Sequence, residues 1–176
     1  MPTWVCERRS NARRFPHVNE LFDEGQRGVL ARRIDEWLAA MAAADPAIQA
    51  VDRTGAVEGV GDQALRWYVR LHGVDKEITT IWFSLVQRTL RYETYVMPAP
   101  EENAAELYEH VLRRNEQLVG AHYSIGVEDA VFLRGELALA LLDQAEVDRI
   151  IGTLYAEVER SFRTILRLGF ASRFRM

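Results

Sequence analysis

Residues 65–72 read Leu-Arg-Trp-Tyr-Val-Arg-Leu-His, so apolar and polar side chains alternate with a period of two. Successive side chains of a strand point to opposite faces, and the pattern therefore predicts a strand with one buried face. Residues 73–76 suit a hairpin turn, and residues 77–86 are apolar on both faces, as in a central strand. Residues 88–96 alternate again. Connections this short predict three antiparallel strands.

Three segments around these strands show helical spacing of apolar residues. The first runs from Val29 to the Asp45-Pro46 break, and the second from Pro100 to about Gly120. The third follows Asp143, whose side chain forms a capping-box pattern with Glu146, and continues to Gly169. Its apolar stripe is the longest in the chain, so we expect it to pack on the sheet or on a partner.

Two further strands are predicted at residues 121–127 and 130–135, joined at Glu128-Asp129. The glycine-rich residues 47–63 are expected to form a loop or an irregular hairpin. The fold class is therefore α+β, with a single antiparallel five-stranded sheet and packed helices in the order α-βββ-α-ββ-α. Residues 1–25 are interpreted as a loose basic N-terminal arm and residues 26–176 as a single domain.

Composition narrows the class of protein. The chain has 176 residues, is 48% hydrophobic and carries a net charge of −4, which suits a packed domain. A single cysteine, Cys6, and the lack of a long apolar run favour the cytoplasm and no membrane contact. Residues 1–14 and 160–176 are rich in arginine, but the acidic body between them makes nucleic acid an unlikely partner.

Motifs for chemistry are scarce. The four histidines and the lone cysteine have no metal-ligand spacing, and no Gly-x-Ser-x-Gly elbow occurs. Glu93 is expected in a cross-strand ion network with Arg66, Arg70 and Arg91. A deep pocket holding Glu93 or His122 with a perturbed pKa would instead favour an enzyme. Asn115 falls on an apolar stripe and should find hydrogen-bond partners. We therefore expect no catalytic residues, no metal and no cofactor.

The polar side of the three-stranded segment is the candidate partner-binding face. Arginine and tyrosine are enriched at interface cores, because they cover much area and still form hydrogen bonds. A solvated surface with no partner explains the same pattern equally well. The candidate residues are Arg66, Tyr68, Arg70, Thr89, Arg91 and Tyr95.

From about Val29 to Phe174 the chain resembles the YbjN family of bacterial sensory transduction regulators. The resemblance lies in residues 66–71 (Arg-Trp-Tyr-Val-Arg-Leu), 80–82 (Thr-Ile-Trp), 95–103 (Tyr-Val-Met-Pro-Ala-Pro-Glu-Glu-Asn), 112–115 (Leu-Arg-Arg-Asn), and the closing segment from Ser161-Phe162 to Leu168-Gly169-Phe170-Ala171-Ser172. It implies a type III secretion chaperone-like fold and a noncatalytic cytoplasmic protein, often dimeric. The family supplies no catalytic residues.

These observations lead to two hypotheses about function. The first is a noncatalytic regulatory or chaperone-like protein-binding module that acts as a homodimer and binds an unidentified protein or peptide client. The client-binding role is an analogy at the level of the fold alone. The alternative is a regulator that senses a small molecule or contacts nucleic acid through its basic tails.

Overall fold

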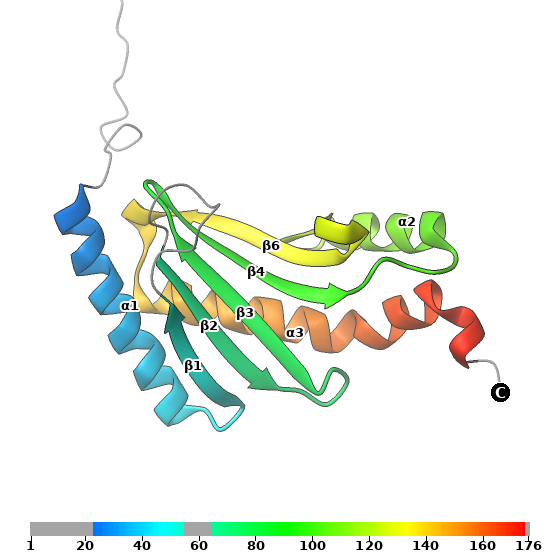
Figure 1. Ribbon diagram of the computed structural model, residues 1–176, viewed down its shortest axis with the longest axis horizontal. Coiled ribbons are helices and arrows are strands. Elements are labelled where there is room, and N and C mark those ends of the chain that lie inside the picture. Colours follow the sequence, from blue (N-terminus) through cyan, green and yellow to red (C-terminus); the bar gives the residue numbers. More distant parts are fainter. Residues whose placement is uncertain (1–22, 55–64, 175–176) are drawn as a thin grey trace, which may run out of the picture.

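A computed structural model describes residues 23–54 and 65–174, and these residues form an α+β structure (Figure 1). Its centre is a six-stranded sheet in the order β1-β2-β3-β4-β6-β5, in which every neighbouring pair is antiparallel. The strands are β1 (Ile48–Thr54), β2 (Leu65–His72), β3 (Ile78–Leu85), β4 (Thr89–Met97), β5 (His122–Ile125) and β6 (Val131–Ala138).

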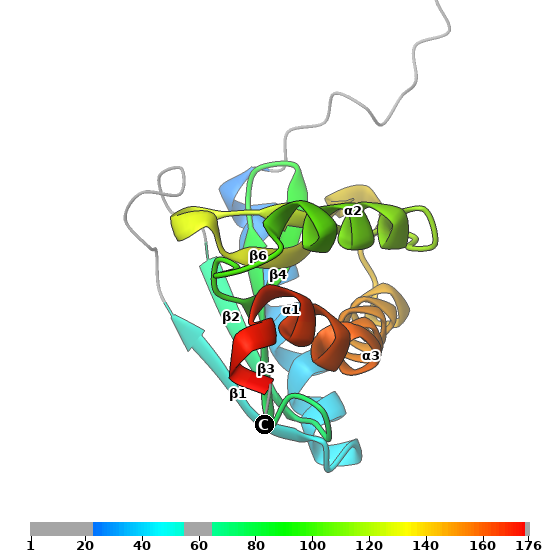
Figure 2. The same cartoon turned by 90° about the vertical axis from the view of Figure 1, so that its right-hand side faces the viewer.

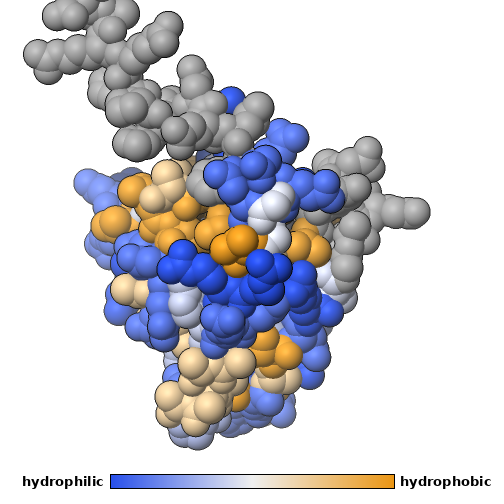
Figure 3. Space-filling view, turned by 90° about the vertical axis from the view of Figure 1, so that its left-hand side faces the viewer, coloured by the Kyte–Doolittle hydropathy of each residue, from blue (hydrophilic) through white to orange (hydrophobic). Residues whose placement is uncertain are grey.

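The sheet is covered by helices on one face. Helices α1 (Glu24–Ala44) and α3 (Gln144–Gly169) pack against the strands, and α2 (Ala104–Asn115) packs on α3 and β5. Figure 1 looks onto the uncovered face, where β2, β3 and β4 pass in front of α3, and Figure 2 shows the strand layer and α3 side by side. Seen from the α1 end, the surface is hydrophilic at its centre, with separate apolar areas above and below (Figure 3).

The expectation of five strands is wrong by one. Residues 48–54 fall in the segment expected to form a loop or an irregular hairpin, and they form the edge strand β1 and pair with β2. The register shifts between Ile48 and Ala50, and such a bulge breaks the alternation by which a strand is recognised. β1 is therefore recognised as a strand only through its pairing with β2. The rest of the predicted loop, residues 55–64, lies outside the described residues.

Two helix boundaries also differ from the prediction. α1 begins at Glu24 rather than Val29, because the Asp23 carboxylate accepts a hydrogen bond from the Gln26 N–H at 2.7 Å. α2 begins at Ala104 rather than Pro100. The N–H groups of Glu101 and Glu102 instead donate to the Gly169 carbonyl, at 2.9 and 3.0 Å, and this holds the segment against the end of α3. Residues 1–22 of the predicted arm lie outside the described residues.

The core lies between the covered face of the sheet and the helices. Trp67 and Phe83 are fully buried there, and the α3 stripe buries Val147, Ile150 and Leu154 as expected. The Trp67 indole N–H donates to the Asp35 carboxylate of α1 at 2.6 Å, and Arg53 of β1 pairs with the same carboxylate. One acid therefore joins α1 to both strands at this edge of the sheet.

The turn between β2 and β3 is held by the α3 residue Glu159. Its carboxylate accepts hydrogen bonds from the N–H groups of Val74, Asp75 and Lys76, at 2.7, 3.0 and 3.1 Å. Burial alone would raise the pKa of Glu159, but these donors and Arg163 outweigh it and hold the pKa below its ordinary value of 4.5. The ionised carboxylate therefore stabilises the folded state.

We predict that Glu159→Gln destabilises the protein by about 1 kcal/mol at neutral pH, since an amide is a weaker acceptor than a carboxylate. Because the folded-state pKa is depressed, the advantage of the wild type is fully present above pH 4.5 and disappears as the pH falls through the folded-state value. Urea unfolding of both proteins across this range checks it. Glu109→Gln, in an exposed pair on α2, is the control. A stability difference that did not vary with pH would contradict this account.

Candidate functional site

The uncovered face of the sheet carries side chains in rows that run across the strands. The strand registers align four residues from four strands in one row. A second row, one pleat away, aligns five residues from five strands. The first row is Arg66, Ser84, Arg91 and Glu136, and the second is Tyr68, Trp82, Glu93, Arg134 and His122.

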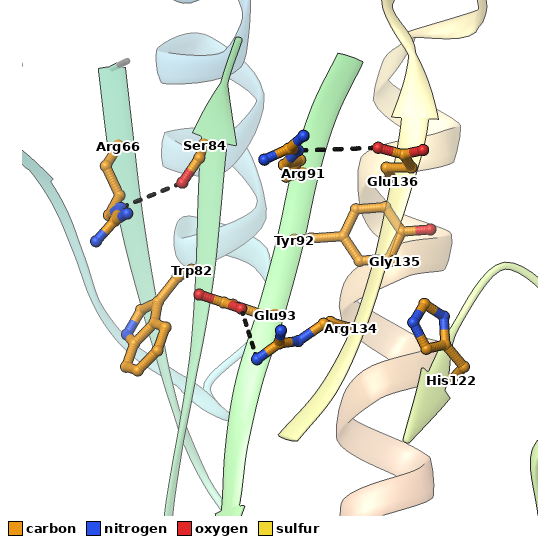
Figure 4. A pocket seen from close by; sticks show the side chains of 10 residues that line it. All are labelled: Arg66, Trp82, Ser84, Arg91, Tyr92, Glu93, His122, Arg134, Gly135 and Glu136. Carbon is orange, nitrogen blue, oxygen red and sulfur yellow. Dashed lines mark hydrogen bonds and ion pairs between the residues drawn. The ribbon is translucent and has the colours of Figure 1, made fainter. Parts of the chain in front are cut away.

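These two rows line a pocket of about 440 Å³ (Figure 4). Ser84 is a small residue between two arginines, so it leaves room above the strands on the uncovered face. Tyr92 lies on the covered side and closes the floor beside Gly135. The lining residues are Arg66, Trp82, Ser84, Arg91, Tyr92, Glu93, His122, Arg134, Gly135 and Glu136.

Charged groups in the pocket are paired across strands, with one exception. Arg134 and Glu93 approach to 3.4 Å, and Arg91 and Glu136 to 3.8 Å. Arg66 donates from Nε to the Ser84 hydroxyl at 3.2 Å, and among the described residues no carboxylate forms an ion pair with it (Figure 4). The lining holds three arginines and two glutamates. The pocket therefore has an excess of positive charge.

Aromatic side chains continue the site beyond the pocket. Tyr68 and Trp82 meet edge to face at 6.5 Å, and Trp82 lies 6.2 Å from Phe132. Phe132 in turn packs edge to face on Tyr95 at 5.6 Å. This aromatic cluster consists of Tyr68, Trp82, Phe132 and Tyr95. Phe132 is buried, and the other three are partly exposed and offer an apolar surface beside charged groups, the composition expected at the centre of an interface.

Lys76, the sole lysine of the chain, supports one end of the aromatic cluster. Its ammonium donates to the Tyr95 carbonyl and lies 5.4 Å from the Tyr95 ring and 5.7 Å from the Phe162 ring. Burial lowers the pKa of Lys76 to about 8, and it raises the pKa of Tyr95, with a smaller contribution from Glu128. Lys76 of the β2–β3 turn thus contacts both the backbone and the ring of Tyr95.

The six candidate residues do not all meet. Arg66 and Arg91 line the pocket, and Tyr68 and Tyr95 belong to the aromatic cluster. Arg70 is exposed outside the pocket, and Thr89 pairs with Ala138 at the end of β4. Glu93 is in a cross-strand ion pair as expected, but its partner is Arg134 of β6 rather than one of the three arginines predicted beside it.

Sequence reasoning missed the contributions of β3 and β6. Trp82 and Ser84 lie in a strand that reads as apolar on both faces, so nothing in the pattern marks them as open. Phe132, Arg134 and Glu136 do alternate with Val131, Leu133 and Leu137. That alternation identifies one face of β6, but only the pairing of β6 with β4 brings the face to the pocket.

A second polar cluster lies on the covered side and joins α2, α3 and β5. Glu157 is 2% exposed and accepts from Arg114 Nε and the Tyr123 hydroxyl, both at 3.0 Å, and the Tyr123 and Ser161 hydroxyls are 2.6 Å apart. Burial raises the pKa of Tyr123, so its hydroxyl stays protonated. Asn115 accepts from the Tyr123 N–H at 2.6 Å, which is the structural role expected of it.

The basic C-terminal segment is not a free tail in the described part of the chain. Residues 160–169 belong to α3, and residues 171–174 form a short 3₁₀ helix, η3. Arg163 pairs with Asp75 at 2.8 Å, and Arg173 pairs with Glu101.

Within residues 23–54 and 65–174, no group of three or more histidine, cysteine, aspartate or glutamate side chains is placed to hold a metal ion. None of the helices there is long and apolar enough to cross a bilayer.

Residues 33–167 match the model of the family YbjN, described as "Putative bacterial sensory transduction regulator". The chain belongs to this family. The matched range begins within α1 and ends within α3, so it includes all six strands, the pocket and the aromatic cluster.

Curated relatives come from mycobacteria. An uncharacterized protein of Mycobacterium leprae is 34% identical over 114 residues, which are 65% of this chain and 62% of that protein. One from Mycobacterium tuberculosis (strain H37Rv) is 37% identical over 105 residues, 59% of this chain and 57% of that protein. The YbjN chain thus spans less than two thirds of the length of these relatives.

Among solved structures, a chain of the heterodimeric ExoU–SpcU complex from the type III secretion system of Pseudomonas aeruginosa is similar. The TM-score is 0.48, with 12% identity, and the match covers 78% of this chain and 98% of that chain.

We predict that Gly135→Ala destabilises the protein by about 2 kcal/mol or more. A Cβ at this position would lie 2.2 Å from the Gly120 carbonyl oxygen and 2.6 Å from the Tyr92 ring. Gly152→Ala in α3 is the control, because a Cβ there meets nothing within 4 Å and alanine favours the helix by about 0.5–1 kcal/mol. Urea unfolding measures both. Equal stability of the two variants would show that the floor of the pocket is not packed as described.

Proposed function

We propose that this YbjN protein is a noncatalytic regulatory module that binds a polypeptide partner on the uncovered face of its sheet. The observation that carries the proposal is a charged pocket directly beside the aromatic cluster, on a face that none of the described helices covers. Aromatic and arginine side chains dominate the energetics of protein interfaces. The family description, a sensory transduction regulator, supports a regulatory rather than a metabolic role.

The contacts within the pocket favour binding over catalysis. The pocket does contain Glu93 and His122, but the Glu93 carboxylate is engaged by Arg134. The Ser84 hydroxyl accepts from Arg66, and among the described residues no histidine or carboxylate is hydrogen-bonded to it. An activated serine would need such a base. These side chains suit the recognition of charge better than the transfer of a proton.

A small molecule is the second candidate ligand, because a volume of about 440 Å³ lies in the range of small-molecule sites. The pairing of Arg163 and Arg173 within the protein weakens the version in which basic tails contact nucleic acid. A polypeptide remains the better match, since the aromatic cluster extends the surface beyond the pocket.

We predict that short peptides selected by display on the wild-type protein lose affinity about tenfold or more for Trp82→Ala, because this change removes the side chain shared by pocket and cluster. Val74→Ala, 84% exposed at the turn between β2 and β3, serves as the control and should bind normally. Fluorescence anisotropy measures the affinities, and circular dichroism confirms that both variants fold. Failure to select peptides, or equal binding by Trp82→Ala, would refute the proposal.

Homodimerisation is part of the same proposal, and α2 is the surface we assign to it. Leu112 of α2 and Val119, in the connection from α2 to β5, belong to the apolar stripe recognised in the sequence, yet they are 65% and 80% exposed. Exposed apolar side chains of this kind favour association with a second copy. This assignment leaves the uncovered face of the sheet free for the partner.

We predict that Leu112→Glu lowers the mass measured by light scattering from twice 20.2 kDa to 20.2 kDa, because it places a charge in the apolar contact. Val74→Glu is the control, since Val74 is 84% exposed at the turn between β2 and β3. A wild-type protein that is monomeric at high concentration would contradict dimerisation. A dimer unaffected by Leu112→Glu would place the contact elsewhere.

A further inference from the structure

Two guanidinium groups flank a small hydroxyl in the first row of the pocket. Arg66, Ser84 and Arg91 are direct neighbours across β2, β3 and β4. Adjacent strands are about 4.8 Å apart, so the long arginine side chains are able to converge above the short serine. The Ser84 hydroxyl accepts from Arg66, which leaves its own hydrogen available to a ligand. The row therefore places three side chains with hydrogen-bond donors next to one another on the uncovered face.

The charged side chains of the pocket favour a ligand group with a negative charge. Glu93 and Glu136 each face an arginine of a neighbouring strand, whereas Arg66 has only the neutral Ser84 hydroxyl among the described residues. An incoming cation would compete with two arginines for the carboxylates already engaged. An incoming carboxylate completes the charge balance, and guanidinium–carboxylate hydrogen bonds are among the stronger ones in proteins.

Trp82, next to the first row, indicates which kind of ligand group binds beside the anion. Trp82 is two residues from Ser84 on β3 and points to the same face, so it lies about 7 Å along the strand. In an extended peptide, side chains two residues apart also share a face. We infer that the pocket binds an Asp or Glu side chain of an extended partner segment, with an apolar residue two positions away packed on Trp82. This inference rests on the proposed function and names its ligand.

A double-mutant cycle tests the inference with the display-selected peptides. The protein is changed by Arg66→Gln and the peptide by Asp→Asn or Glu→Gln at its acidic position. Each change alone should weaken binding about tenfold, and both together should weaken it little further, because they remove the same contact. Arg113→Gln, which removes an equal charge on α2 outside the pocket, should bind as the wild type does.

A measurement on the wild type alone makes the test independent of variant folding. Titration of the ¹⁵N-labelled protein with the acidic peptide should shift the amide resonances of Arg66, Ser84 and Arg91. Shifts confined to the helices would overturn the inference. Titration with inorganic phosphate is a separate arm: if phosphate gives the same shifts but does not weaken binding of the acidic peptide, the pocket is for a free anion and the inference fails.

The outcomes separate this inference from the proposed function. Peptides that depend on Trp82 but contain no acid, or that bind Arg66→Gln normally, would overturn the inference and leave the binding face intact. Peptides that depend on neither residue would overturn both. Peptides with an acid two positions from an apolar residue, coupled to Arg66 in the cycle, would support both.

Discussion

The antiparallel register of β2, β3, β4 and β6 is the constraint on which the rest of the structure depends. It directs Trp67 and Phe83 into the core and directs Ser84 and Trp82 to the uncovered face. A shift by one residue would exchange the two sets of side chains, burying the arginines and exposing the core. The same register that builds the core therefore also builds the rows of the pocket.

Polar contacts to the helices fix this register at several places. Asp35 joins α1 to Trp67, and Glu159 binds the turn between β2 and β3. At the other end of the sheet, Glu157 and Asn115 hold β5 through the side chain and backbone of Tyr123. Such directional hydrogen bonds specify one arrangement of the strands relative to the helices. The apolar side of α3 stabilises the fold by burial, which is less specific for that arrangement. None of these contacts to the helices uses side chains of the pocket, so those side chains are available to a partner.

The parts of the fold predicted from the sequence are those specified by local pattern. The alternation in residues 65–72 and 88–96 identifies β2 and β4, and the long stripe with its Asp143 cap identifies α3. β1 is not predicted because a bulge disrupts its alternating pattern. The start of α2 is not predicted correctly because the carbonyl of Gly169, distant in sequence, accepts hydrogen bonds from the N–H groups of Glu101 and Glu102, which precede the helix.

The candidate site was predictable only in part for the same reason. Arg66, Tyr68, Arg91 and Tyr95 follow from local alternation. Arg134 and Phe132 reach the site through the pairing of β4 with β6, which encloses α2 and β5 and has no local signal. Periodicity assigns a residue to a face, but only the order of the strands decides which faces adjoin.

The most direct test of this account is the hydrogen-exchange rate of the tryptophan indole N–H groups in the full chain, measured by NMR. The account predicts strong protection of Trp67, which is fully buried and bonded to Asp35, and rapid exchange of Trp82 on the uncovered face. Trp82 protected as strongly as Trp67 in the free protein would mean that the sheet is covered on both faces, and would contradict the account.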